Sequence, residues 1–267
     1  MESHLFIGAG FYFLSTVAHL FYLFSQRVLA FRLGHILLGV GLLVHTIGLV
    51  GQAVGLRGLP VGSHQELLSF LAWGLVSAYL IAQARLRLKV LGAFVSPVAT
   101  LFLLSASAVP GGVWPVARNR WLPVHVTLLF VGEAIFALAF LLGTMYLIQE
   151  HLVKRKRVGP IFRQLPSLAM LDKLNFRCLT LGFPLLTLGM ITGAFLAQGA
   201  WGAYWSWEAK EVLALITWLL YAGQLYSRLT AGWRGRRAAI FSIAGFIALL
   251  FTFLGVRMLS PNGDNLV

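Results

Sequence analysis

The chain has 267 residues, of which 59% are hydrophobic and only 11% are charged, and its mean hydropathy is +0.84. Soluble domains average about 45–50% apolar and about 25% charged residues, so this composition excludes a soluble enzyme. Cys178 is the single cysteine, which excludes a disulfide-rich secreted domain and a thiol–disulfide mechanism within one chain. The apolar excess is therefore expected to be surface that faces lipid.

Eight apolar runs, each about 20 residues long and thus long enough to cross a bilayer, are bounded by charged residues or by Gly/Pro-rich turns. They lie at 5–25, 34–55, 67–84, 90–109, 122–149, 178–198, 209–228 and 237–257. The runs are continuous and do not alternate with polar residues, which favours helices over a barrel. The sequence predicts an all-α integral membrane protein, a bundle of about eight transmembrane helices.

The net charge of +13 is explained by how the basic residues are distributed on the two sides of these spans. Sixteen basic residues fall on one side of the predicted spans and five on the other. Because Lys and Arg are retained on the cytoplasmic side, both termini are expected outside, in a multi-pass protein of the cytoplasmic membrane. The charge is thereby explained without nucleic acid, and no nucleic-acid partner is expected.

A dense aromatic cluster occupies the outer loop between the sixth and seventh spans, where residues 201–211 read WGAYWSWEAKE. Trp201, Tyr204, Trp205 and Trp207 fall within seven residues. One interpretation is an aromatic belt, which Trp and Tyr form at membrane surfaces. The density of the tryptophans favours a second interpretation, a platform on which a flat apolar ligand stacks.

A second outer segment, residues 110–127, places Arg118 and Arg120 shortly before His125, about one turn into the fifth span. Imidazole can ligate haem iron, and arginines can pair with propionate carboxylates. A plain polar anchor at the helix end is the alternative interpretation of His125.

Three ionisable residues lie inside the spans: His19 in the first, His45 in the second and Glu133 in the fifth. Such residues are costly in a membrane and are usually functional or paired. For the histidines, neutral interhelical hydrogen bonding is one interpretation, and an intramembrane haem site with His19 and His45 as its ligand pair is the other. Glu133 is expected to be protonated or hydrogen-bonded inside the bundle.

The segment WGAYWSWEAKEVLALITW resembles the tryptophan-rich signature of the cytochrome c assembly family of membrane haem-handling proteins. The resemblance extends to QELLSFLAW, VHVTLLFVGEAIFALAF, GFPLLTLGMITGAF and GWRGRRAAIFSIAGFIALLFTFLGV, and it is nearest to the CcsA and HemX-like branches. It implies one transmembrane haem-handling domain over residues 1–267.

The resemblance also implies a haem site, with haem b as the cofactor and His125 as the ligand of the haem iron. The implied cofactor-binding residues are Trp201, Tyr204, Trp205, Trp207, Glu208, Arg118, Arg120 and His125. Glu208 stands where the family usually has Asp. Tyr226, in the stretch LYSR, replaces a family histidine, and no histidine follows the last span. The chain itself thus offers one outer axial ligand, and a partner chain is the candidate source of a second.

Three functions follow as hypotheses. The first is a haem-handling protein of cytochrome c biogenesis that holds haem on the outer platform for delivery to apocytochrome c, together with a CcsB-like membrane partner. It would be a haem chaperone or a subunit of a synthetase, without catalytic activity of its own. The alternative is a HemX-like regulator of early haem biosynthesis that contacts a cytosolic enzyme through the basic loop 150–177. A small-molecule transporter is disfavoured, because intramembrane charges are few and no inverted repeat stands out.

Overall fold

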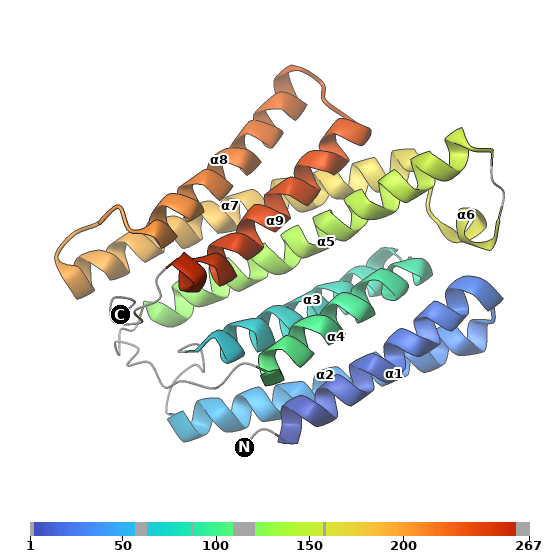
Figure 1. The fold of residues 1–267 in the computed structure, drawn as a ribbon, viewed down its shortest axis with the longest axis horizontal. Coiled ribbons are helices and arrows are strands. Elements are labelled where there is room, and N and C mark those ends of the chain that lie inside the picture. The colour runs from blue at the N-terminus through green and yellow to red at the C-terminus, as the bar shows by residue number, and fades with distance from the viewer. Residues whose placement is uncertain (1–2, 57–62, 87, 109–120, 157–158, 260–267) are drawn as a thin grey trace. The chain divides into compact units, whose positions relative to one another are not determined.

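The computed structural model describes residues 3–56, 63–86, 88–108, 121–156 and 159–259 (Figure 1). Throughout these ranges the regular elements are helices, and seven of them are long and apolar enough to cross a membrane. The predicted all-α membrane fold is thus confirmed. The chain divides into two compact units, Met1–Val113 with His151–Pro166, and Trp114–Glu150 with Ser167–Val267.

The first unit contains the N-terminal helices. They are α1 (Ser3–Ser25), α2 (Val28–Leu56), α3 (His64–Leu86), the 3-10 turn η1 (Lys89–Leu91), α4 (Gly92–Ala108) and the short α6 (Pro160–Gln164). Helix α1 packs against α2 and α4, and α3 packs against α4. Polar contacts join these helices inside the unit. The Thr16 and Thr100 hydroxyls of α1 and α4 lie 3.1 Å apart, and the Trp73 indole N–H of α3 donates to the Thr46 hydroxyl of α2. Such bonds hold helices together where lipid offers no hydrophobic driving force.

The second unit contains most of α5 (Leu122–Lys154), α7 (Leu168–Trp201), α8 (Ala209–Thr230) and α9 (Arg236–Leu259). Helices α8 and α9 lie side by side, and α7 packs against both (Figure 1). Glycines bring α5 close to its neighbours. A Cβ atom at Gly189 of α7 would collide with the Leu129 side chain of α5, and one at Gly143 of α5 would lie 2.9 Å from the Ala239 carbonyl oxygen of α9. Small residues at these crossings allow the close backbone approach typical of membrane helices.

The first seven predicted spans coincide with the seven candidate spans of the structure. The eighth, 237–257, lies within α9, whose side chains are described as far as Thr252. The largest difference is at α7, which begins at Leu168, ten residues before the predicted start at 178. The charged residues of this segment predict a loop. It is helical because Ser167 caps its N-terminus, accepting a hydrogen bond from the Met170 N–H, and because Asp172 is paired with Arg228 of α8.

Candidate functional site

His125 lies in the first turn of α5, half-buried against α7. Its Nδ1 is 2.9 Å from the Gly189 carbonyl oxygen and 3.2 Å from the Thr192 hydroxyl. Because a carbonyl can only accept, Nδ1 carries the proton and donates it to this bond. The lone pair is then on Nε2, to which no hydrogen bond is made within the described residues. Metal-ligating histidines have this arrangement, with one ring nitrogen held by a carbonyl and the other free for the metal.

Glycines on the α7 surface leave room for the His125 ring. A Cβ atom at Gly193 would lie 2.8 Å from His125 Cε1, so that any side chain there would displace the imidazole. Gly189, which accepts the hydrogen bond, and Gly193 form a G-x-x-x-G pair on one face of α7. Neither glycine is among the candidate site residues taken from the sequence, although their G-x-x-x-G spacing is a signal that could have indicated a close helix contact here.

The tryptophan loop, residues 202–208, joins α7 to α8. It begins at Gly202, whose φ of +74° ends α7 in a left-handed turn. The rings of Trp205 and Trp207 lie edge to face, with centroids 5.7 Å apart and planes 84° apart. They are therefore not arranged as one flat platform. Trp207 is 74% exposed, whereas the Trp205 Nε1 is buried without a hydrogen-bond partner in the described part of the chain.

The end of the loop is fixed to α8. The Ser206 N–H donates a hydrogen bond to Glu211 Oε2 over 2.7 Å. Glu208 is the N-cap residue of α8, but its side chain makes no capping hydrogen bond. Its carbonyl oxygen instead accepts from the Val212 N–H. The Glu208 carboxylate is thus not engaged at the helix end, which leaves its charge for another role.

Of the remaining residues of the predicted site, some are exposed in the structure and others lie outside the described residues. Tyr204 is exposed and packs edge to face with Phe195 of α7, with ring centroids 5.9 Å apart. Arg118, Arg120 and the side chain of Trp201 lie outside the described residues. Tyr226, which stands where the family has a histidine, is exposed on α8.

Lys210 connects the loop electrostatically to α5. It lies in the first turn of α8, and its charge acts on His125 and on Glu133. Glu133 is 2% exposed, and its Oε2 has no hydrogen-bond partner within the described residues. Lys210 is therefore a charge that acts on both His125 and Glu133. The ring partner of Trp205 among the described residues is Trp207, and no ring contact joins either indole to His125 there.

The histidines inside the first unit do not share a site. Both ring nitrogens of His45 are occupied, with Nδ1 3.2 Å from the Tyr12 hydroxyl and Nε2 2.7 Å from the Ser69 hydroxyl. His19 Nδ1 lies 3.0 Å from the Ser15 carbonyl oxygen, and its ring packs edge to face with Tyr79. Tyr12 and His19 are seven residues apart on α1, about 10 Å along the axis. The two histidines make separate interhelical contacts, and no bond joins them within the described residues.

His125 is suited to supply one axial ligand to a haem, because with Nδ1 on the Gly189 carbonyl its Nε2 makes no hydrogen bond among the described residues. In the same part of the chain the Trp205 N–H has no acceptor, and the charge of Lys210 acts on His125. Taken with the helices, these features define a multi-pass, all-α membrane protein that carries a histidine suited to iron at one end of its second unit.

Comparisons with known proteins agree with this class. Residues 61–262 match the sequence profile of the family described as Cytochrome C assembly protein. The cytochrome c biogenesis protein CcsA of Guillardia theta is 34% identical over 223 residues, covering 75% of this chain and 74% of the relative. CcsA of Microcystis aeruginosa is 33% identical over 251 residues, covering 75% and 76%. The chain belongs to the cytochrome c assembly protein family.

A solved structure shares the fold. Cytochrome c Heme Lyase CcmF superposes with a TM-score of 0.71 at 14% sequence identity. The alignment covers 94% of this chain and 46% of CcmF, so the chain spans about half of that larger protein. At this identity the likeness concerns the fold alone.

Proposed function

We propose that this protein handles haem during cytochrome c maturation, holding haem on the outer face of the cytoplasmic membrane for delivery to apocytochrome c. The observation that carries the proposal is the geometry of His125, whose Nδ1 is held by the Gly189 carbonyl while Nε2 is left for iron. The names of the CcsA relatives, which are cytochrome c biogenesis proteins, support the same process.

In this proposal each part of the site has a role. His125 would ligate the iron, and the indoles of Trp201, Trp205 and Trp207, together with Tyr204, would contact the macrocycle. The cations Arg118, Arg120 and Lys210 are the candidates to pair with the propionates, and Glu208 is a further candidate residue of the haem site. Bound haem b supplies the group that becomes attached to apocytochrome c through thioether bonds. A CcsB-like membrane partner is the proposed source of the second axial ligand.

Deletion of the gene distinguishes a function in cytochrome c maturation from one in the regulation of haem synthesis. In the deletion strain, haem-dependent staining of denaturing gels should lose the bands of c-type cytochromes, because attachment fails, while b-type haem persists in the membranes. The wild-type gene on a plasmid is the control and should restore the bands. If the c-type bands persist and total haem changes instead, the HemX-like regulatory function is the correct one.

The tryptophan pair should contribute directly to haem affinity. Replacing Trp205 and Trp207 with Leu keeps the loop apolar but removes two indole faces, each worth on the order of 1 kcal/mol. Haem titration of the purified double variant should show affinity about tenfold or more below wild type. Trp233→Leu, beyond the opposite end of α8, is the matched control and should bind haem normally. Equal affinity of the double variant and wild type would support the aromatic-belt interpretation.

The outer placement of the loop can be measured by labelling. With Cys178 replaced by Ser, a cysteine at position 206 in place of Ser206 should react with membrane-impermeant maleimide added outside intact cells. This follows from the excess of basic residues on the opposite side of the spans. Labelling that requires access from the cytoplasm would reverse the topology and move the proposed haem site to the inner face.

A further inference from the structure

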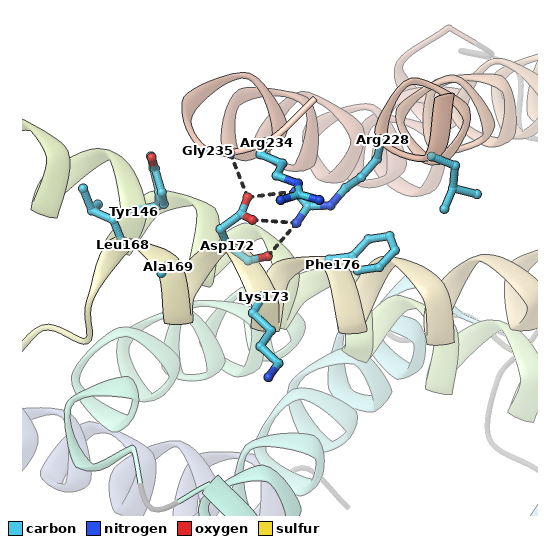
Figure 2. Close-up of a pocket in the computed structure, with 10 residues that line it drawn as sticks. Tyr146, Leu168, Ala169, Asp172, Lys173, Phe176, Arg228, Arg234 and Gly235 are labelled. Carbon is cyan, nitrogen blue, oxygen red and sulfur yellow. Dashed lines mark hydrogen bonds and ion pairs between the residues drawn. The ribbon is translucent and has the colours of Figure 1, made fainter. Parts of the chain in front are cut away.

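A cavity of about 680 Å³ lies in the second unit where α7 begins, α8 ends and α9 begins (Figure 2). The tryptophan loop joins the other ends of α7 and α8, so the cavity is remote from the proposed haem site. Its walls include three cations, one carboxylate and several apolar side chains; those that matter here are Asp172, Lys173, Phe176, Arg228, Leu229 and Arg234.

One cation of the wall is already neutralised. Asp172 forms a two-pronged ion pair with Arg228, with Nη1 2.8 Å from Oδ1 and Nη2 2.6 Å from Oδ2. The Gly235 N–H donates a further hydrogen bond to Asp172 Oδ1 over 2.7 Å. The Arg228 guanidinium also lies 4.6 Å from the centroid of the Phe176 ring, so both charged groups are fixed as part of the wall.

The other two cations have no such partner. Arg234 and Lys173 are exposed, and within the described residues neither takes part in an ion pair. Figure 2 shows Lys173 pointing away from the Asp172 carboxylate, whereas the charge of Arg234 acts on that carboxylate. Arg234 is therefore the uncompensated cation on the side of the cavity where the ion pair lies, and it favours an anionic ligand.

Apolar side chains line the same cavity as this cation. Leu229 is 66% exposed, and the Phe176 ring lines the same cavity. The apolar spans that contain α7 and α8 run 168–199 and 209–230, so the cavity lies at a membrane boundary. A ligand that matches both features has an acidic head and an apolar body, and lipid is present at this boundary. Basic pockets between membrane helices commonly bind acidic lipid headgroups in this way.

We propose that this cavity is a binding site for an anionic phospholipid, with the headgroup phosphate on Arg234 and the first part of an acyl chain over Leu229 and Phe176. The site is independent of the proposed haem function, because it uses other residues at the other end of the helices.

Lipid retention by the purified full-length protein tests this site. Native mass spectrometry of protein titrated with phosphatidylglycerol, and separately with phosphatidylcholine of the same chains, should show one phosphatidylglycerol molecule bound in preference. Arg234→Gln should weaken that binding about tenfold, since one charge-assisted phosphate contact is lost. Arg177→Gln, which removes an exposed charge of α7 outside the cavity wall, is the matched control and should change binding less than twofold.

Three results would overturn the proposal. Equal loss of phosphatidylglycerol in Arg234→Gln and Arg177→Gln would mean that diffuse surface charge attracts the lipid. Full displacement of phosphatidylglycerol by millimolar inorganic phosphate would identify a site for free phosphate. The thermal midpoint of Arg234→Gln should equal that of wild type, because the Asp172–Arg228 pair is untouched. A lowered midpoint would assign Arg234 to the fold and remove it from lipid binding.

Discussion

The His125→Gly variant is expected to lose its haem, with the haem content of the purified protein falling to about a tenth of wild type or less. The imidazole belongs to the one histidine in the sequence of the second unit, and its Nδ1 is already held by the Gly189 carbonyl. Exogenous imidazole should restore part of the haem content, because it can occupy the space of the missing ring. Haem content is measured by the pyridine haemochrome assay.

The matched control for this variant is His151→Gly. His151 is an exposed histidine near the other end of α5, so the substitution carries the same helix penalty of about 1 kcal/mol without touching the site. Its haem content should equal that of wild type. If both variants retain haem, or if both lose it to the same extent, His125 is not the ligand.

The Asp172→Ala variant should be the most destabilised of the ion-pair variants, by about 3 kcal/mol in the free energy of unfolding. Arg228 and Asp172 side chains are 7% and 16% exposed, so loss of the carboxylate leaves a guanidinium in a nearly dry environment. The Gly235 N–H loses its acceptor as well. The thermal midpoint in detergent should fall by roughly 6–12 °C, as followed by circular dichroism.

A second ion pair of the same unit supplies the control. Arg236 lies 3.7 Å from Glu150, but its side chain is 61% exposed. Pairs of this kind contribute between zero and about 1 kcal/mol, so Arg236→Gln should leave the midpoint nearly unchanged. The double variant Asp172→Leu/Arg228→Leu should be more stable than Asp172→Ala, because it removes both charges at once. Similar midpoints for Asp172→Ala and Arg236→Gln would contradict the importance assigned to the buried pair.

The helices could be predicted because a membrane-spanning segment must satisfy its own backbone in lipid, and hydropathy alone reveals such segments. The start of α7 could not. Residues 168–177 are charged, and their helix depends on Asp172 meeting Arg228, which is 56 residues away in the sequence. A contact between residues so far apart in the chain leaves no local pattern in the sequence. The division of the chain into two compact units likewise has no composition shift to indicate it, and a single haem-handling domain stays a prediction.

The residue types of the proposed haem site come from the sequence, whereas their arrangement does not. The place of His125 at the end of a span singles it out, but the carbonyl and glycines that orient it belong to α7. The loop pattern predicts a platform for a flat apolar ligand, and the edge-to-face packing of Trp205 and Trp207 depends on loop backbone conformation. Pairing of His19 with His45 requires equal depth, and the structure instead gives His45 its own partners in Tyr12 and Ser69.

The most direct test of the haem site is the spin state of ferric haem bound to the purified full-length protein, read from its absorption spectrum before and after imidazole is added. With His125 as the one ligand from this chain, the haem should be high-spin, and imidazole should convert it to low-spin by filling the open position. A low-spin, bis-histidine spectrum that survives His125→Ala would contradict the assignment and place the iron on other histidines of the chain.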